Sequence, residues 1–310
     1  MNLRQLRYMC EVARRPDFNV SAAAETLHIN QPGISKQIKL LEEELGVTIF
    51  QRSKNRFIGL TEEGSRIVAH AEVILNGAAS IREIGKERNS DRAGLLVIAV
   101  THTQARYFLP PVMKRFAVMY PKVRITMRHA DPERIVNMLS TGEADLGVTT
   151  NEAPPGSSII VLPCREFKRV VLVPRNHPLT RVRRLTLKQL STYPLVTYEP
   201  AFTAREIVLD AFRKANLDPK VVVSATDSDV IKTCVEQGLG YAVLSEIAYH
   251  RTRDSLLVAL PTGQLFQAAT TRLWLWRSRY IKRYTYDFIE LCSSNWNRGA
   301  VENLQVARIR

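Results

Sequence analysis

The chain has 310 residues, of which 45% are hydrophobic and 24% charged, and it carries a formal net charge of +14. This length exceeds the usual size of one domain, so we expect two or three domains with sizeable cores. No segment approaches the roughly 18 consecutive apolar residues of a membrane-spanning helix, and the arginine-containing start is not typical of a signal peptide. We therefore expect a cytoplasmic protein that does not bind membranes.

Neither the charge nor the cysteines identify a function. Most of the positive excess lies beyond residue 90, where it suits solubility or the steering of an anionic ligand as well as DNA binding. The four cysteines are scattered without CxxC spacing. This pattern indicates neither a zinc site nor a disulfide framework, and we expect no metal and no cofactor.

Residues 19–45 predict two short helices joined by a tight turn. Asn19 or Ser21 is the expected N-cap of the first helix, and Asn30 that of the second. Pro32 lies in the first turn of the second helix, where its missing N–H is harmless. The small packing face of the first helix carries Ala22, Ala23 and Leu27. The apolar stripe of the second helix, which should face the core, carries Ile34, Ile38, Leu41 and Leu45.

The opposite face of the second helix is polar and basic, as a DNA-reading helix requires. In helix-turn-helix docking, the first turns of the second helix meet base edges in the major groove. Lysines there can pair with phosphates or guanines, and Gln or Ser can exchange hydrogen bonds with bases. The expected DNA-binding residues of this helix are Gln31, Pro32, Ser35, Lys36 and Lys39. The alternative is an ordinary amphipathic hairpin whose charges are merely solvated.

The flanking segments complete a winged module over residues 1–60. Residues 47–60 hold two apolar runs around a basic stretch, which predicts a small hairpin wing. Arg52 and Lys54 near its tip are expected to touch the DNA backbone or minor groove. Upstream, the apolar positions of residues 3–13 predict a first helix.

Residues 61–88 predict one long helix, with Thr61 as its N-cap. Its apolar residues follow a four-three spacing: Ile67, Ala71, Ile74, Ala78 and Ile81. At ~1.5 Å per residue the helix is about 40 Å long. That is too long to pack only on its own small domain, so we expect it to pair two chains and present two DNA-reading helices to successive major grooves. Residues 61–90 form this linker, and residues 89–94 supply a hinge.

Beyond the hinge, strands and helices alternate, which predicts an α/β domain over residues 91–310. The first lobe has strands near residues 95–100, 123–130 and 144–150, and the chain crosses to a second lobe near residues 166–179. The second lobe has strands within residues 193–200, 221–226 and 240–245. We therefore expect two similar lobes with a ligand cleft between them.

Hydroxyl side chains follow the ends of several of these strands. Ligands of open α/β sheets lie beyond the carboxyl ends of strands, and hydroxyls with free helix N–H groups bind compact anions. The candidates are Thr101, Thr103, Gln104, Thr149, Thr150 and Thr203. Each alone also suits a cap or strand residue. Arg106 stays outside the expected site, and His102 should point away from the threonines. Asp227 and Asp229 are interpreted as helix caps or as first-turn partners of the helix dipole rather than as a metal pair.

Several segments resemble a known family. The opening NLRQLRY, the segment QPGISKQIKLLEEELGVTIFQR and LTEEG are similar to the amino-terminal domain of LysR-type transcriptional regulators. The resemblance departs at residues 15–19, where many members have a Gly-Ser-Phe type turn. THTQARYFLP, YPLVTYEPAFTAR, ATDSDVIKT and YTYDFIE resemble the CysB-type branch, which regulates sulfur assimilation, and its sulfonate-regulating relatives.

This resemblance implies a winged helix-turn-helix, a long linker helix and a two-lobed effector domain similar to periplasmic binding proteins. It implies a sequence-specific regulator of cysteine biosynthesis or of sulfonate and sulfate-ester use. Sulfate, adenosine phosphosulfate or acetylserine would be the effector, bound at positions matching Thr101, Thr103, Gln104, Thr150 and Thr203. The segment TTNEA departs from the family pattern at the cleft rim. The implied partners are operator DNA, further copies of the chain in a homodimer or homotetramer, and RNA polymerase as a candidate.

Two alternatives remain open at this point. A LysR-type regulator of an unrelated pathway would bind another small organic acid, although a cleft lined by hydroxyls argues against an aromatic one. An enzyme fused to a DNA-binding head is more remote, because the sequence has no GxSxG, HExxH, P-loop or GxGxxG motif and its histidines are dispersed. We therefore expect no catalytic residues.

Overall fold

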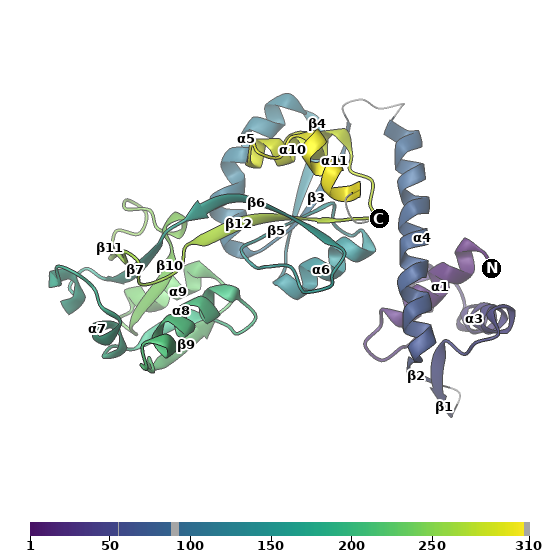
Figure 1. Ribbon diagram of the computed structural model, residues 1–310, viewed down its shortest axis with the longest axis horizontal. Coiled ribbons are helices and arrows are strands. Elements are labelled where there is room, and N and C mark those ends of the chain that lie inside the picture. Colours follow the sequence, from purple (N-terminus) through teal and green to yellow (C-terminus); the bar gives the residue numbers. More distant parts are fainter. Residues whose placement is uncertain (55, 88–92, 307–310) are drawn as a thin grey trace. The chain divides into compact units, whose positions relative to one another are not determined.

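The structure, a computed structural model, describes residues 1–54, 56–87 and 93–306 (Figure 1). The chain divides into two compact units: Met1–Asn89 with Ser278–Tyr280, and Ser90–Arg277 with Ile281–Arg310. Within the described ranges, no helix combines the length and the apolar character needed to cross a lipid bilayer.

The first unit is a winged helix-turn-helix followed by a long helix. Asn19 accepts hydrogen bonds from the backbone N–H groups of Ser21 and Ala22, and Asn30 accepts one from Gly33, so Asn19 rather than Ser21 is the first cap. The two strands of the wing pair antiparallel, as predicted. The elements are α1 (Leu3–Ala13), α2 (Val20–Leu27), α3 (Gln31–Leu45), β1 (Phe50–Ser53), β2 (Arg56–Leu60) and α4 (Glu62–Glu87).

Two residues of this unit that were predicted to pack into the core differ in the structure. Ile34, Ile38 and Leu41 of α3 are fully buried, as expected. Leu45 is 37% exposed, because α3 ends there and Gly46 takes a left-handed conformation that turns the chain away. On α2, Ala24 rather than Ala22 is buried beside Ala23.

Helix α4 begins as predicted, since the Thr61 hydroxyl accepts a hydrogen bond from the Gly64 N–H at 2.8 Å. Ala71 packs into the core of the first unit, whereas large apolar side chains further along are exposed in the single chain: Val73, Ile74, Ile81 and Ile84. Of the predicted hinge, residues 89–92 lie outside the described residues, as does residue 88. The prediction that residues 93 and 94 belong to the hinge was wrong, because they begin a strand that pairs with residues 122 and 123.

The second unit contains two α/β lobes. The five-stranded sheet of lobe 1 has the order β4-β3-β5-β12-β6, in which β12 runs antiparallel to both of its neighbours. Helix α6 packs on one face, against Trp274 and Ala99, and α5 and α10 pack on the other. The elements are β3 (Ala93–Val100), η1 (Gln104–Phe108, a π-helical turn), α5 (Leu109–Met119), β4 (Lys122–His129), α6 (Pro132–Thr141), β5 (Leu146–Thr149), β6 (Ile159–Phe167), β12 (Ala269–Trp276), α10 (Arg283–Cys292) and α11 (Arg298–Val306).

Lobe 2 repeats the layered plan with the sheet order β11-β7-β10-β8-β9. Side chains alternate along β7, so Val171 and Val173 join the core under α7 and α8, while Leu172 joins the core under α9. The elements are β7 (Arg169–Pro174), η2 (Pro178–Arg181), α7 (Leu187–Ser191), β8 (Leu195–Tyr198), α8 (Thr203–Lys214), β9 (Val221–Ala225), α9 (Ser228–Glu236), β10 (Tyr241–Ser245), η3 (Glu246–Ala248) and β11 (Leu257–Pro261).

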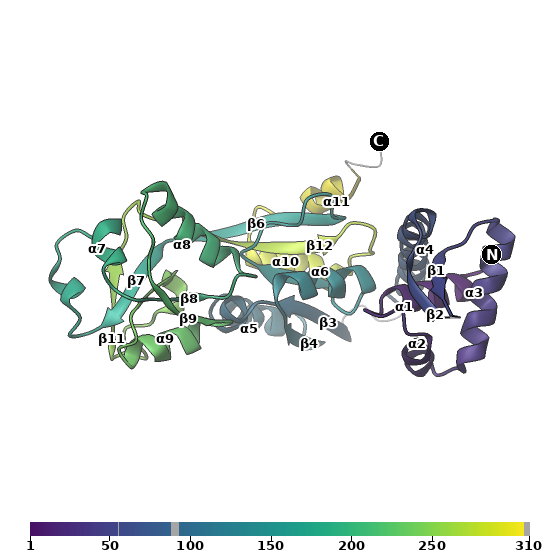
Figure 2. The same ribbon diagram turned by 90° about the horizontal axis from the view of Figure 1, so that it is seen from below.

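The chain passes between the lobes twice, as Figures 1 and 2 show. The first crossover is at Lys168, between β6 and β7, within the segment where a crossover was predicted. The second is residues 262–268, between β11 and β12. The two crossovers together form the hinge region of the effector unit, and the carboxyl ends of β3 and β5 lie beside it.

Candidate functional site

A cavity lies between the two lobes at the carboxyl ends of β3 and β5. We call it the inner cavity; its total empty volume, including space open to solvent, is about 460 Å³, but the centres of water-sized molecules fit in only about 30 Å³ of it. Its lining contains hydroxyls, an amide and a guanidinium, and it contains no carboxylate. The lining residues are Thr101, His102, Thr103, Gln104, Thr150, Arg169, Tyr198, Phe202, Ala204, Thr226, Ser245 and Ala269.

Four of the five predicted effector residues line the inner cavity, and three of them meet there because residues 101–104 directly follow β3. Gln104 is 1% exposed, and its side-chain oxygen accepts a hydrogen bond from the Thr271 hydroxyl at 2.8 Å, which leaves its amide N–H groups for the cavity. The Thr103 hydroxyl lies 3.3 Å from the Tyr198 hydroxyl and 3.3 Å from that of Ser228, both in lobe 2. Burial raises the pKa of Tyr198, so its phenol stays neutral and can donate.

The other two predicted residues lie partly elsewhere. An outer cavity adjoins the inner one, and Thr150, Arg169, Ala204 and Ala269 line both. Thr203, the first residue of α8, lines only the outer cavity. The five predicted residues therefore border two adjoining cavities rather than one. Thr149, the sixth candidate, is fully buried, and its hydroxyl accepts a hydrogen bond from the Asn151 N–H.

Arg169 is the residue of the site that the sequence did not reveal. It opens β7, is 3% exposed, and donates from Nε to the Gln267 carbonyl oxygen at 2.8 Å. Among the described residues no carboxylate pairs with its guanidinium, and burial lowers its pKa below the ordinary arginine value. In sequence it follows Lys168 and looks like an exposed crossover residue. Only the pairing of β7 with β10, which sets Arg169 opposite Ser245, places it inside.

A cluster of charged side chains joins the lobes beside the inner cavity. We call it the interlobe clasp: Arg106 and Tyr107 of lobe 1, with Asp229 and Lys232 of α9 in lobe 2. The Tyr107 hydroxyl donates to Asp229 Oδ1 at 2.7 Å, and Arg106 Nε lies 3.0 Å from Asp229 Oδ2. Lys232 Nζ donates to the Tyr107 oxygen at 2.9 Å and pairs with Asp254 at 2.9 Å.

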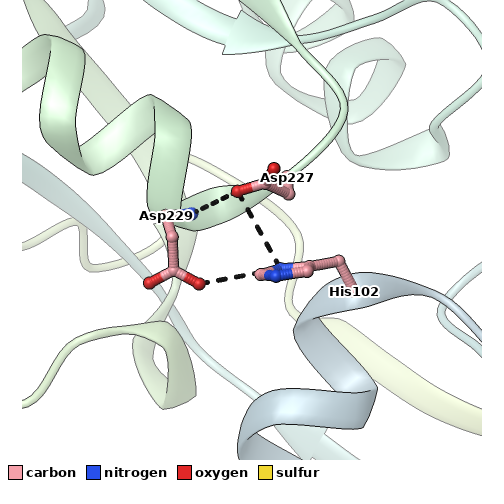
Figure 3. A group of neighbouring side chains, drawn as sticks. All are labelled: His102, Asp227 and Asp229. Carbon is pink, nitrogen blue, oxygen red and sulfur yellow. Dashed lines mark hydrogen bonds and ion pairs between the residues drawn. The ribbon is translucent and has the colours of Figure 1, made fainter. Parts of the chain in front are cut away.

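His102 lines the inner cavity, and Figure 3 shows its ring beside the carboxylates of Asp227 and Asp229. Its Nδ1 is 3.9 Å from Asp227 Oδ1 and 3.7 Å from Asp229 Oδ2, so the ring faces the carboxylates of lobe 2. The ligand atoms of these three residues all lie within 4.8 Å of one another, which is close enough for a metal ion. However, Asp227 caps α9 through the N–H groups of Asp229 and Val230. Because Arg106 and Lys232 already neutralise Asp229, the arrangement favours a protein clasp over a cation site.

The predicted DNA-binding residues lie on the outer surface of the first unit. Gln31, Pro32, Lys36 and Lys39 are exposed, and Ser35 is half-buried. The wing residue Lys54 is exposed and takes a left-handed conformation with φ +46°.

The wing residue Arg52 already has partners within the chain. Arg52 pairs with Glu42, and its guanidinium lies over the Phe57 ring at 5.0 Å. Glu42 also accepts hydrogen bonds from the N–H groups of Ile49 and Phe50. Glu42 therefore fixes the wing to α3, and Arg52 must leave or share this partner to reach DNA.

Comparison with known proteins identifies both units. Residues 3–65 match the bacterial regulatory helix-turn-helix protein family of the lysR type, and residues 89–297 match the LysR substrate binding domain. The chain is 41% identical over 304 residues to the HTH-type transcriptional regulator SsuR of Burkholderia cenocepacia, covering 98% of each. It is 40% identical over 302 residues to CysB of the same organism, covering 97% of this chain and 96% of that one. It is 39% identical over 294 residues to the regulator cbl of Escherichia coli, covering 95% and 93%.

Solved structures agree with these matches. The cofactor-binding domain of the Cbl transcriptional regulator superposes with a TM-score of 0.66 at 37% identity, covering 69% of this chain and 93% of that one. A full-length OxyR variant from Pseudomonas aeruginosa superposes with a TM-score of 0.71 at 27% identity, covering 94% and 96%. The predicted fold class and the predicted DNA-binding regulator are thus confirmed, and the relatives are transcriptional regulators rather than enzymes. The chain belongs to the LysR family of transcriptional regulators.

Proposed function

We propose that this LysR-family regulator controls genes of sulfur assimilation, and that its effector is a small oxyanion bound in the inner cavity. One observation carries the proposal: the inner cavity offers hydroxyl, amide and guanidinium donors and is lined by no carboxylate. Such a lining favours a negatively charged ligand rich in acceptor oxygens. The similarity to SsuR, CysB and cbl over nearly the whole chain supports the sulfur-related pathway.

Sulfate, adenosine phosphosulfate and acetylserine are the proposed effectors. Thr101, Thr103 and Gln104 would donate hydrogen bonds to the anion in the inner cavity. Thr150 and Thr203 border the outer cavity, where they would contact the remainder of an effector larger than sulfate. Because an effector larger than sulfate would extend across both cavities, the five predicted residues need not all contact the same group of the effector.

We further propose the three-part organisation of residues 1–60, 61–90 and 91–310 in a cytoplasmic homodimer or homotetramer. The exposed apolar side chains of α4 support pairing of two chains along this helix. Gln31, Pro32, Ser35, Lys36, Lys39, Arg52 and Lys54 would contact an operator with inverted symmetry. RNA polymerase is a candidate partner at the promoter.

The effector would act by biasing the distance between the lobes. Thr103 already joins lobe 1 to Tyr198 and Ser228 of lobe 2, so an anion bound here contacts groups from both lobes. A ligand that binds the closed arrangement more tightly shifts the population towards it. In an oligomer, the altered lobe arrangement changes subunit packing and the spacing of the DNA-binding heads, which bends operator DNA differently.

The test combines one ligand screen with two substitutions. Thermal unfolding is measured with sulfate, thiosulfate, O-acetylserine, N-acetylserine and adenosine phosphosulfate, since a ligand of the native state raises the apparent stability. Thr103→Ala should weaken the active ligand by roughly 2- to 10-fold through loss of a hydrogen bond and leave operator affinity unchanged. Lys36→Ala should weaken operator binding, lower its salt dependence by about one charge, and leave ligand affinity unchanged.

Conservative variants serve as controls. Thr103→Ser keeps the hydroxyl and Lys36→Arg keeps the charge, so both should remain near wild type. If an organic acid without sulfur gave the only stabilisation, the regulator would belong to another pathway. If the purified protein showed no preference for any duplex over random competitor DNA, the proposed function would be wrong.

A further inference from the structure

Two cationic side chains are buried in the part of the effector unit that the structure describes, Arg169 and Lys232. Lys232 is 5% exposed, and it pairs with Asp254 at 2.9 Å and with Asp229 at 3.2 Å. Arg169 is 3% exposed, and among the described residues its side chain donates a hydrogen bond only to the Gln267 carbonyl oxygen. A buried charge without a counter-charge destabilises the folded protein. The unpaired state of Arg169 therefore indicates a ligand that supplies the missing negative charge.

The guanidinium lies where such a ligand would be bound. Arg169 lines both the inner and the outer cavity, whereas Thr101 and Gln104 line only the inner one and Thr203 only the outer one. An anion held by the threonine hydroxyls would therefore be next to a guanidinium. Arginine presents a planar set of donors that suits the paired oxygens of sulfate, sulfonate or carboxylate groups.

Arg169 also connects the two crossovers of the hinge region. Its backbone follows Lys168 at the first crossover, and its Nε donates to Gln267 in the second. Its carbonyl oxygen accepts a hydrogen bond at 2.8 Å from the hydroxyl of Thr262, where the second crossover begins. A ligand that binds this guanidinium therefore acts on both crossovers, the two segments that join the lobes.

We propose that Arg169 determines the charge preference of the effector site: it selects oxyanions by supplying their counter-charge, and it transmits their binding to the hinge. This inference rests on the proposed anion site. It adds a residue to that site and sets the effector class as an oxyanion whose charge, and not only its oxygen atoms, is recognised.

The experiment separates charge recognition from hydrogen bonding with three ligands of similar shape. Sulfate, methanesulfonate and dimethyl sulfone present oxygens on a tetrahedral sulfur but carry two, one and no negative charges. Isothermal titration of the wild-type protein should show affinity falling steeply along this series. Arg169→Gln should lose roughly 10- to 100-fold in sulfate affinity, the range for a hydrogen bond between charged groups, and should bind sulfate and methanesulfonate alike. Arg169→Lys keeps the charge and should retain most of the discrimination.

Unfolding without ligand distinguishes this role from simple bracing. Removing an unpaired buried charge should leave the ligand-free protein as stable as wild type or more stable, whereas removing a bracing side chain should lower its stability. Arg165→Gln is the matched control, because Arg165 is an exposed arginine of β6 close to the same crossover. It should change neither affinity nor discrimination.

Each outcome decides the question. If Arg169→Gln binds sulfate like wild type, or loses stability while keeping its affinity, the inference is overturned and the anion site itself stands. If the wild-type protein binds all three ligands equally, the inference of charge recognition is overturned. This outcome needs only the wild-type protein, so the inference can be tested even if Arg169→Gln does not fold. If wild type binds no anion, the proposed function fails first.

Discussion

Asp229 carries the densest set of charged contacts between the lobes. It accepts a hydrogen bond from Tyr107 and pairs with Arg106 of lobe 1 and with Lys232 of its own helix. Burial alone would raise the pKa of Asp229, but the hydrogen bonds from Tyr107 and Lys232 and the charges of Lys232 and Arg106 outweigh it. The net effect lowers the pKa below its ordinary value of 3.8.

This shift predicts an acid-sensitive clasp. A carboxyl group whose pKa is lower in the folded state contributes stability that is complete above its unfolded pKa, about 3.8, and is lost as pH falls through the folded pKa. Asp229→Asn should therefore be less stable than wild type near neutral pH, and the difference should shrink as pH falls below about 3.8. Thermal unfolding midpoints between pH 7 and pH 3 measure this difference.

Asp210→Asn is the control for this measurement. Asp210 also has a lowered pKa, because Lys214 donates a hydrogen bond to it, but the pair lies on the surface of α8. Solvent screening makes such pairs nearly neutral for stability, so this variant should follow wild type at every pH. A stability difference for Asp229→Asn that does not change with pH would contradict the role of its charge.

The sequence predicted the roles of some single residues and not those of others. Asp227 was predicted as a cap from its place before a helix, and its hydrogen bonds to the backbone of α9 confirm it. The partners of Asp229 could not be predicted, because Arg106 and Tyr107 are more than 120 residues away in sequence. Arg169 was missed for a related reason, since burial of a crossover arginine depends on β10, which begins 72 residues later, at Tyr241. His102 was expected to point away from the cavity, yet it lines it.

At the scale of elements, two of the three glycines of α4 have opposite surroundings. A side-chain carbon added at Gly64 would overlap the carbonyl oxygen of Ile49 and would lie 2.9 Å from the Thr61 hydroxyl. At Gly77 nothing lies within 4 Å. The first turn of α4 can therefore approach the wing only because residue 64 has no side chain.

The two alanine variants should thus shift stability in opposite directions. Gly64→Ala should destabilise the first unit by about 1–3 kcal/mol, because overpacking forces the backbone apart. Gly77→Ala should stabilise it by about 0.5–1 kcal/mol through higher helix propensity alone. Urea unfolding followed by circular dichroism measures both. Equal effects of the two variants would mean that the close approach at Gly64 does not restrict the fold.

Elements with strong local signals were predictable, and those that depend on distant partners were not. Helical spacing and cap residues located α1, α2, α3 and the start of α4 within a residue or two. Strands β6 and β12 were not identified, because their pairing joins residues more than 100 positions apart and β6 contains Pro163. The π-helical turn η1 also escaped prediction, since the sequence resembles the start of an ordinary helix.

At the scale of the whole molecule, each unit has its own hydrophobic core. The core of the first unit is built from α1 to α4 and the wing, and the cores of the second unit from the two sheets and their helices. We therefore expect two separable unfolding transitions in calorimetry. A tightly bound effector at 100 times its Kd adds about 2.7 kcal/mol, which should raise only the transition of the second unit by roughly 5–10 °C.

Operator DNA should raise only the other transition. Because a 10- to 100-fold loss of affinity lowers [L]/Kd from 100 to about 10 or 1, Arg169→Gln should reduce the effector-induced shift to about half or less and keep the DNA-induced one. A single transition that both ligands move together would instead show that the two units unfold as one cooperative body. Family and fold class could be predicted at this scale, because the winged module and the α/β alternation each have local signatures.

The strands of the lobe 1 sheet are synthesised in a different order from the one in which they lie side by side in the sheet. The sheet of lobe 2 is complete once residue 261 has been synthesised, since all its strands lie between residues 169 and 261. The sheet of lobe 1 must wait for β12, which occupies the position between β5 and β6. On the ribosome, β5 and β6 therefore leave unpaired edges until late in translation, and such edges invite aggregation. Biosynthesis of this regulator should be most vulnerable to chaperone shortage in that interval.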